Sequence, residues 1–181
     1  MTEPEELIDF WYADDTRKRW FKSTAEFDQH LATKYSQMWQ HALDGLYDDW
    51  TNNAKGCLAL CILLDQIPRN IFRGSAKAYA SDARAREICK HAIDTGVNAA
   101  LSEDESRFLY MPLMHSEVLA DQDLSIQMFA EAGLAQQSKF AHHHRDIIEK
   151  FGRFPHRNEK LGRVSSAAEL RYLQSKSAFK G

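Results

Sequence analysis

The stretch CLALCILLDQIPRNIFR, residues 57–73, decides the fold. Its first eight residues are apolar without interruption, and no alternation of polar and apolar side chains marks them as a strand. Such a run is typical of a helix that other elements surround on all sides. We therefore predict a buried central helix that closes at Asp65 and Gln66, because Pro68 disfavours helical geometry in the residue before it. Gly56 counts against this helix, since glycine in a helix costs about 1 kcal/mol relative to alanine.

Polar side chains follow the apolar run directly. A polar group near a protein core must be paired or must face a cavity, because burying it alone is costly. The end of the central helix is therefore the first candidate site, and its members are Asp65, Gln66, Arg69, Asn70 and Arg73.

The composition is that of a single globular domain. The chain has 181 residues, of which 44% are hydrophobic and 27% are charged, and no linker or repeat divides it. We expect one domain over residues 1–181, with a tail that frays from about residue 175. The net charge of −3 argues against nucleic-acid binding, which usually needs a basic face.

Further features predict a soluble, cytoplasmic protein. No apolar run reaches the roughly 18 residues of a membrane span, and the acidic N-terminus lacks the basic start of a signal peptide. Cys57, Cys61 and Cys89 are odd in number and form no CxxC, so we expect reduced, packed thiols. Cys57 and Cys61 lie one helical turn apart and could hold a metal, but no third ligand is nearby. We predict neither a metal nor a cofactor.

Helical periodicity continues through the rest of the chain. Serine followed three residues later by glutamate has the form of a capping box, and this pattern recurs at Ser23, Ser102 and Ser166. The apolar spacing predicts helices over residues 4–14, 24–44, 83–95, 107–119 with a kink or restart at Pro112, 121–132, 134–151 and 167–174. Together with the central helix this makes eight or nine helices and no strand, hence a compact, antiparallel all-α array.

A second candidate cluster follows Pro112 and contains His115, Ser116, Glu117, Asp121, Gln122 and Asp123. Glu117 and Asp121 are spaced as neighbours on one helical face. Two carboxylates there would repel each other unless a divalent metal or a pair of arginines lies between them. Because the chain has arginines in its other clusters, we favour arginine.

The third cluster is HHHRDIIEKFGRFPHRNEKLGR, residues 142–163. His144 shares a helical face with apolar residues, so it is either a satisfied core histidine or a functional one. Beyond Gly152, the donors Arg153, His156, Arg157 and Asn158 suit the recognition of a carboxylate or phosphate. The alternative is that these arginines tie the loop to carboxylates such as Asp65 and Glu117.

Three segments, LLDQIPRNIFRG (63–74), YMPLMHSEVLADQ (110–122) and HRDIIEKFGRFPHRNEKLGR (144–163), resemble the signature segments of the bacterial domain of unknown function 924 family. The resemblance covers nearly the whole chain. It departs mildly at Ile67, where phenylalanine is common, and at Val118, where aspartate is common. It implies an all-α fold of antiparallel helix pairs similar to tetratricopeptide-like proteins, and it implies no activity.

We predict that the three clusters converge on a pocket for a small anionic molecule, a carboxylate or a phosphate, and we leave open whether a reaction is catalysed. Arg69, Arg153 and Arg157 would hold the anion, and His115 or His156 would transfer a proton, oriented by Glu117 or Asp65. The candidate catalytic residues are His115, Glu117 and His156. The candidate ligand-binding residues are Asp65, Gln66, Arg69, Asn70, Arg73, Asp121, Gln122, His144, Arg153, Arg157 and Asn158.

Two alternatives stay open. A tetratricopeptide-like module would use the arginines to grip an acidic peptide of a partner protein. A purely structural lattice of buried ion pairs would instead fix the helix packing. An extended groove favours the first, mutually saturated side chains favour the second, and a closed pocket favours a metabolite. The sequence leaves the oligomeric state open.

Overall fold

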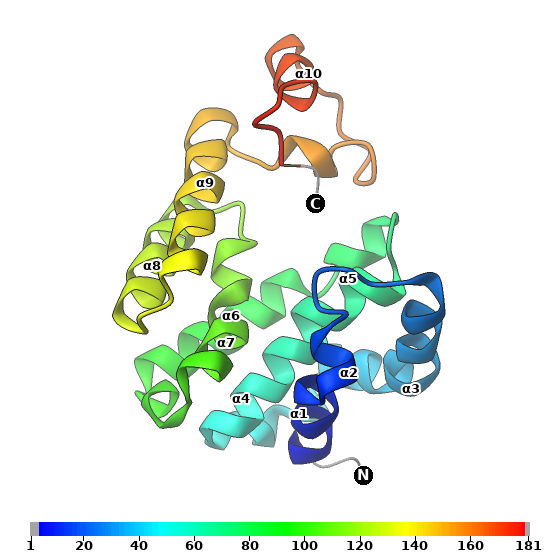
Figure 1. Cartoon of the computed structure of the whole chain (residues 1–181), viewed down its shortest axis with the longest axis vertical. Coiled ribbons are helices and arrows are strands. Elements are labelled where there is room, and N and C mark those ends of the chain that lie inside the picture. Colours follow the sequence, from blue (N-terminus) through cyan, green and yellow to red (C-terminus); the bar gives the residue numbers. More distant parts are fainter. Residues whose placement is uncertain (1–3, 180–181) are drawn as a thin grey trace.

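The computed structural model describes residues 4–179, and these residues form helices without any β-strand (Figure 1). This confirms the predicted all-α class. The α-helices are α1 (Pro4–Tyr12), α2 (Asp14–Arg17), α3 (Ala25–Leu43), α4 (Ala54–Cys61), α5 (Ile67–Ile71), α6 (Asp82–Asp94), α7 (Glu103–Met114), α8 (Leu119–Glu131), α9 (Ala135–Phe151) and α10 (Ala167–Leu173). Short helical turns η1 (Asp48–Asn52), η3 (Ala76–Tyr79), η4 (Val97–Ala100) and η5 (Pro155–Arg157) connect them. No helix within residues 4–179 has the length and apolar character that crossing a bilayer requires.

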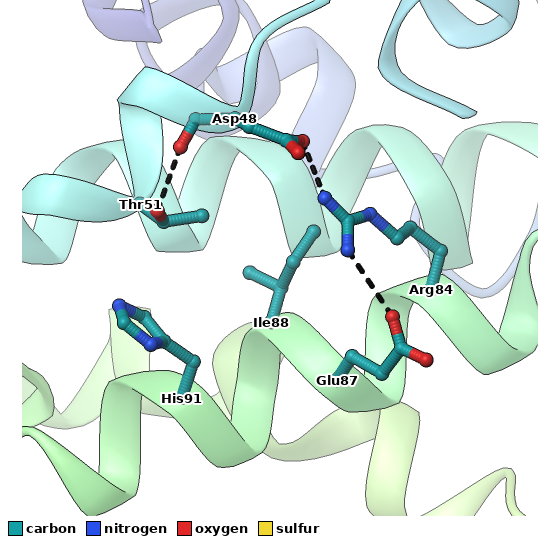
Figure 2. Close-up of a pocket in the computed structure, with 6 residues that line it drawn as sticks. All are labelled: Asp48, Thr51, Arg84, Glu87, Ile88 and His91. Atoms are coloured by element: carbon teal, nitrogen blue, oxygen red, sulfur yellow. Dashed lines mark hydrogen bonds and ion pairs between the residues drawn. The ribbon is translucent and has the colours of Figure 1, made fainter. Parts of the chain in front are cut away.

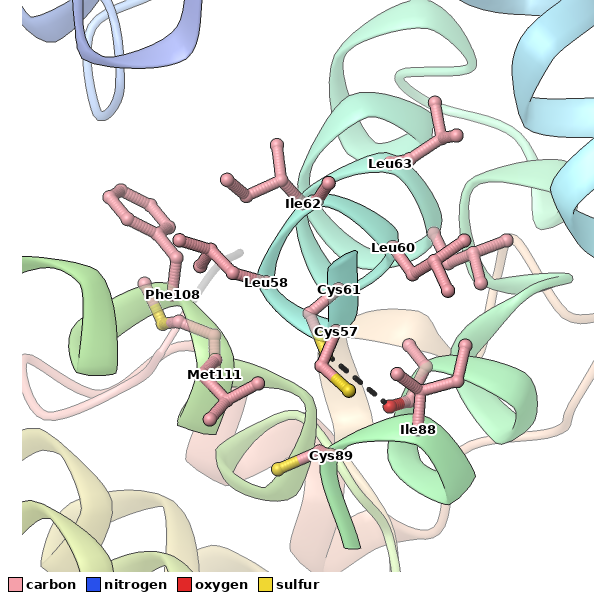
Figure 3. Packing of buried hydrophobic residues seen from close by; sticks show 14 of the residues in the cluster. Cys57, Leu58, Leu60, Cys61, Ile62, Leu63, Ile88, Cys89, Phe108 and Met111 are labelled. Carbon is pink, nitrogen blue, oxygen red and sulfur yellow. Dashed lines mark hydrogen bonds between the residues drawn. The ribbon is translucent and has the colours of Figure 1, made fainter. Parts of the chain in front are cut away.

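The central rod consists of α4, a π-helical turn η2 (Ile62–Gln66) and α5. Every residue from 56 to 68 is buried, because α1, α6 and α7 pack around α4 while α3 packs on α5. Figure 3 shows Leu58, Ile62 and their neighbours among side chains of α6 and α7. The apolar run therefore forms the buried helix that its composition predicts.

The expectation that the rod closes at Gln66 is wrong, because the helix continues through Pro68 into α5. Proline lacks the N–H that would bond to the carbonyl of Leu64, four residues earlier. The hydroxyl of Ser81, at the start of α6, donates to that carbonyl instead at 2.5 Å. The π turn also places the N–H of Ile67 on the carbonyl of Ile62. These two bonds satisfy the backbone where proline disrupts it.

Close packing explains why a glycine stands at position 56 within the helix. A Cβ atom at this position would lie 1.9 Å from the carbonyl oxygen of Trp50 in η1. Only glycine lets η1 approach the rod this closely, so the loss of helix propensity at Gly56 accompanies a close contact.

The three cysteines are free and buried. Figure 3 shows Cys57 and Cys61 on the rod and Cys89 on α6. Burial raises the pKa of Cys61 and of Cys89 well above the usual thiol value, so both thiols are protonated at neutral pH. Within residues 4–179 no group of three or more histidine, cysteine or acidic side chains is arranged to hold a metal ion.

Several element ends differ from the predictions. The first helix breaks at Ala13 into α1 and α2. The N-cap of α3 is Thr24, whose hydroxyl accepts from the N–H of Phe27, so the capping box predicted at Ser23 is wrong. The boxes at Ser102 and Ser166 are confirmed. Most important for the site, α7 ends at Met114 and α8 begins at Leu119, so residues 115–118 are a loop and not the predicted helix.

The C-terminal segment, residues 153–179, packs beside the main core on a small core of its own. Ile147 and Ile148 of α9 and Phe154 are buried together there, with Tyr172 and Phe179 against them. Figure 1 shows this segment, in orange and red, beyond the end of α9. Residues 175–179, where we expected fraying, fold back so that the N–H of Phe179 bonds to the Tyr172 hydroxyl at 2.9 Å. Lys180 and Gly181 lie outside the described residues.

Candidate functional site

A cavity of about 350 Å³ lies between the end of the central rod and the C-terminal segment. The rod side contributes the end of α5, η3 and the residue after α7, and the C-terminal side contributes η5 and the following turn. The lining residues are Arg69, Arg73, Gly74, Ala78, Tyr79, His115, His156, Arg157, Lys160 and Phe179.

The innermost part of the site is a carboxylate–histidine pair. Asp65 is fully buried, and its two carboxylate oxygens lie 2.8 and 3.0 Å from Nδ1 of His115. The amide of Gln66 and the guanidinium of Arg69 also contact this carboxylate. Because Nδ1 of His115 is occupied by Asp65, the opposite ring nitrogen, Nε2, is the one left for the cavity. Asp65 lies in the π-helical turn η2 of the central rod.

Asp82, the first residue of α6, holds two arginines of the cavity wall. Its carboxylate accepts from Nη1 and Nη2 of Arg69 at 3.1 and 3.3 Å and from Nη1 of Arg157 at 3.2 Å. Nη2 of Arg157 donates to the backbone carbonyl of His115 at 2.9 Å. The Arg157 guanidinium lies 4.6 Å from the ring centres of both Tyr79 and Phe154. These contacts fix the two cations despite their like charge.

The outer wall adds two further cations. Nε of Arg73 lies 2.8 Å from the carboxylate of Asp28, and more than half of the Arg73 side chain is exposed. Lys160 forms no ion pair with any residue between 4 and 179. The opening of the cavity is therefore more exposed than its floor, and it carries one basic group with no acidic partner in the described chain.

Protonation follows from burial and from these charges. Burial alone would raise the pKa of Asp65, but Arg69 and His115 outweigh it and lower that pKa to about 2. Burial lowers the pKa of His115, with Arg69 and Arg157 acting in the same direction and Asp65 against them. Burial, Arg157 and Lys160 lower the pKa of His156 to about 3. At neutral pH the site thus holds an ionised carboxylate and two neutral imidazoles.

Of the candidate residues, five line the cavity: Arg69, Arg73, His115, His156 and Arg157. Asp65 and Gln66 lie directly behind His115. Asn70 accepts from Arg73 at 3.4 Å and is half-buried beside the opening. The structure therefore brings together the first cluster, His115 of the second and two residues of the third.

Glu117 and Asp121 do not share a helical face, so the expectation that arginines lie between them on that face is wrong. Glu117 lies in the loop before α8, where Arg163 binds its two oxygens at 2.7 and 2.9 Å and the N–H of Phe154 donates to it. Asp121 accepts from the Ser116 hydroxyl at 2.6 Å and pairs with Arg86 and Lys90. Each carboxylate has its own basic partners and lies outside the cavity lining.

The remaining candidates also have partners away from the cavity. The Gln122 amide donates to three backbone carbonyls at the end of α7. Nδ1 of His144 bonds to the carbonyl of Phe140 within α9. Arg153 donates from Nε and Nη2 to the two carboxylate oxygens of Glu169 at 2.7 and 2.9 Å. The side-chain amide of Asn158 donates to Ser165 and Glu169. Arg153 and Asn158 therefore hold the C-terminal segment together, whereas Gln122 and His144 bond within the helical core, and all four fit the structural alternative.

Four contributors escaped the sequence analysis: Tyr79, Asp82, Lys160 and Phe179. Asp82 and Tyr79 directly precede the helix predicted over residues 83–95, where Asp82 has the form of an N-cap residue and not of a site residue. Lys160 belongs to the third cluster, but nothing in its spacing distinguishes it from solvated lysines. Phe179 lies in the segment expected to fray, and its ring packs 4.4 Å from His144 and 5.0 Å from His156, centre to centre.

A second, smaller cavity of about 230 Å³ lies between η1 and α6. Figure 2 shows its Arg84 between the carboxylates of Asp48 and Glu87, with Thr51, Ile88 and His91 completing the lining. Two carboxylates and one arginine leave this cavity with a net negative charge, so it does not suit an anion. The cavity beside His115 is the better candidate.

Comparison with known proteins places the chain in a family. The family model described as "Bacterial protein of unknown function (DUF924)" matches residues 7–177. The chain belongs to the DUF924 family. This confirms the resemblance seen in the three sequence segments, while the likeness to tetratricopeptide proteins stays a prediction.

A solved protein of similar structure is the protein of unknown function ATU0120 from Agrobacterium tumefaciens. It is 38% identical, with a TM-score of 0.89 over 94% of this chain and 96% of that chain. No curated protein matches the chain. The DUF924 fold is thus shared with a solved protein, and the function must be argued from the site itself.

Proposed function

We propose that the protein binds a small anion, a phosphate or a carboxylate, in the cavity between the central rod and the C-terminal segment. The charge of the lining carries this proposal. Arg69, Arg73, Arg157 and Lys160 line the cavity, and no carboxylate is among its described lining residues. The acids that anchor two of the arginines lie behind them, since the side chains of Asp65 and Asp82 are only 1% and 17% exposed.

Arg157 is the strongest single indication. The residue is 6% exposed, and its Nε atom is enclosed without a hydrogen-bond partner in residues 4–179. Buried donors in folded proteins are nearly always paired, and a buried guanidinium is costly to maintain. An anion in the adjacent cavity would lie near this guanidinium and compensate its charge.

The size of the cavity selects the class of ligand. A volume of about 350 Å³ falls at the lower end of the roughly 300–1,000 Å³ typical of small-molecule sites. A metabolite with one anionic group fits this space better than an extended acidic peptide would. Tyr79 and Phe179 provide apolar surface for the rest of such a molecule.

Titration calorimetry with inorganic phosphate and with succinate, on the whole chain, tests the proposal. Lys160→Gln removes a cation that has no ion-pair partner within residues 4–179, so it leaves the fold intact. We expect this variant to bind the preferred anion about tenfold more weakly, which corresponds to about 1.4 kcal/mol. Lys139→Gln, an exposed lysine on α9, is the matched control and should bind as the parent does. Absence of binding of both anions to the parent would contradict the proposal.

We also propose a cytoplasmic location. All three cysteines are free in the described structure, and persistent free thiols are typical of a reducing compartment. Thiol labelling of the denatured protein, purified without reductant, tests this, since mixed disulfides in freshly isolated protein would contradict it.

A further inference from the structure

We infer that this cavity is also a hydrolytic site, in which His115 acts as the general base in the cleavage of a small phosphate monoester. The inference rests on the proposed anion binding and deepens it by naming a reaction and a substrate class. Its basis is the pair formed by Asp65 and His115, which lies in the same cavity wall as Arg69 and Arg157.

The pair has the geometry that a general base requires. The ionised Asp65 carboxylate accepts a hydrogen bond from Nδ1 of His115 at 2.8 Å, which fixes the tautomer whose lone pair is on Nε2. Gln66 and Arg69 hold the carboxylate in turn, so the group that orients the imidazole is itself fixed. The Nε2 atom has no hydrogen-bond partner within residues 4–179 and is free to accept a proton from water.

His156, the other histidine of the cavity, lacks these features. No carboxylate among the described residues is bonded to it, and its ring packs between Phe154 and Phe179 at 5.6 and 5.0 Å, centre to centre. Its pKa of about 3 makes it a weak base and leaves it without a proton to give at pH 7. The geometry therefore assigns proton transfer to His115 alone.

The cations next to His115 favour a phosphate ester. A phosphate dianion carries twice the charge of a carboxylate, and phosphoryl transfer is promoted mainly by positioning and by cations around the phosphoryl oxygens. Arg69 and Arg157 are held at Asp82 and at the His115 carbonyl, so they are fixed before a substrate arrives. The space for the alcohol part lies beside Tyr79 and Phe179.

In the reaction, a water oxygen forms a bond to phosphorus while one water proton moves to Nε2 of His115. The bond between phosphorus and the leaving oxygen breaks with its electron pair on that oxygen, which departs as an anion and takes up a proton from solvent. The products are an alcohol and inorganic phosphate. His115 then returns its proton to solvent. Because His156 does not supply a proton to the leaving oxygen, the best substrates have leaving groups that depart as stable anions, such as phenolates and enolates.

Charged and titratable groups surround His115 from every side and shape its pH dependence. From the rod come Asp65 and Arg69, and from α9 comes His144, whose own pKa of about 3 keeps it neutral. Arg73 lies on the rod side of the cavity, and His156, Arg157 and Lys160 lie across it. Burial disfavours a protonated imidazole, Arg69 and Arg157 act in the same direction and Asp65 acts against them, so the pKa of His115 is lowered and the ring is a neutral base at neutral pH.

Hydrolysis of 4-nitrophenyl phosphate by the whole chain, followed from pH 4 to 9, tests the inference. We expect turnover that rises with pH and then levels off. His115→Gln should lower kcat by roughly 10²–10⁴-fold, whereas His142→Gln, an exposed histidine on α9, should behave as the parent. Equal turnover in His115→Gln and the parent, or no turnover by the parent, would overturn the inference.

Asp65→Asn separates positioning from mere stability. Removing the carboxylate removes the group that favours a charged imidazole, so the rise of kcat/KM should move to lower pH. A structural role alone would change the amount of folded protein without moving that inflection. A phosphorylated His115 in the quenched reaction would also contradict the assignment, since it would make His115 a nucleophile. If phosphate binds with Lys160-dependent affinity but no ester is cleaved, only the hydrolytic inference fails.

Discussion

Replacing Asp82 by asparagine should destabilise the protein more than any surface change, although asparagine has nearly the same shape. Asp82 compensates two buried guanidiniums, since the side chains of Arg69 and Arg157 are only 21% and 7% exposed. Asparagine keeps one acceptor oxygen, and its amide N–H groups face the N–H groups of the arginines. Breaking a buried ion pair by removing one partner costs about 3–5 kcal/mol. Because Arg69 keeps Asp65, we expect a loss of about 2–4 kcal/mol.

Equilibrium unfolding in urea measures this loss, and a thermal scan should show a decrease in Tm of roughly 5–15 °C. Asp15→Asn is the control, because Asp15 pairs with Lys18 while 98% exposed, and it should unfold as the parent does. Inorganic phosphate should stabilise Asp82→Asn more than the parent, since it supplies the missing negative charge. A loss of unfolding free energy below about 0.5 kcal/mol would refute the view that Asp82 holds Arg69 and Arg157 in the cavity wall.

Two further results follow from the geometry. Gly56→Ala places a Cβ 1.9 Å from the Trp50 carbonyl oxygen and should cost about 1–3 kcal/mol in urea unfolding; equal stability would show that η1 can move away from the rod freely. His156 has a pKa lowered to about 3 against about 6.5 unfolded, so the unfolded chain binds its proton first and stability falls as pH drops from about 6.5 towards 3. His156→Gln should flatten this fall in urea midpoints measured between pH 7 and 4, and an unchanged slope would count against a buried, neutral His156.

The central rod shows how far the sequence predicts the fold. An unbroken apolar run is expected to be buried, because its own residue types favour removal from water. Residues 56–68 are indeed all buried. The continuation through Pro68 could not be predicted in the same way. It depends on the hydroxyl of Ser81 reaching the Leu64 carbonyl, a contact between positions far apart in the chain. Rules based on neighbouring residues detect the proline, but they do not detect the distant hydroxyl that satisfies the carbonyl the proline leaves without a donor.

In the candidate site, too, the local sequence predicts some features, while others depend on contacts between distant residues. The polar clusters were visible because Arg, His, Asp and Glu gather at predicted helix ends. Which of them would face a cavity was not visible, since it depends on pairing across the fold. Glu117 is saturated by Arg163, whereas Asp65 supports His115. Because residues 115–118 form a loop and not the predicted helix, the placement of Glu117 and Asp121 on one helical face was also wrong.

The measurement that tests the central claim most directly is a crystal structure of the protein soaked with tungstate, an anomalously scattering analogue of phosphate. We predict an anomalous peak inside the cavity, within hydrogen-bond distance of Arg69 or Arg157 and beside Nε2 of His115, and its loss on competition with excess phosphate. A cavity that stays empty while tungstate occupies other sites on the molecule would contradict the claim that this is an anion site.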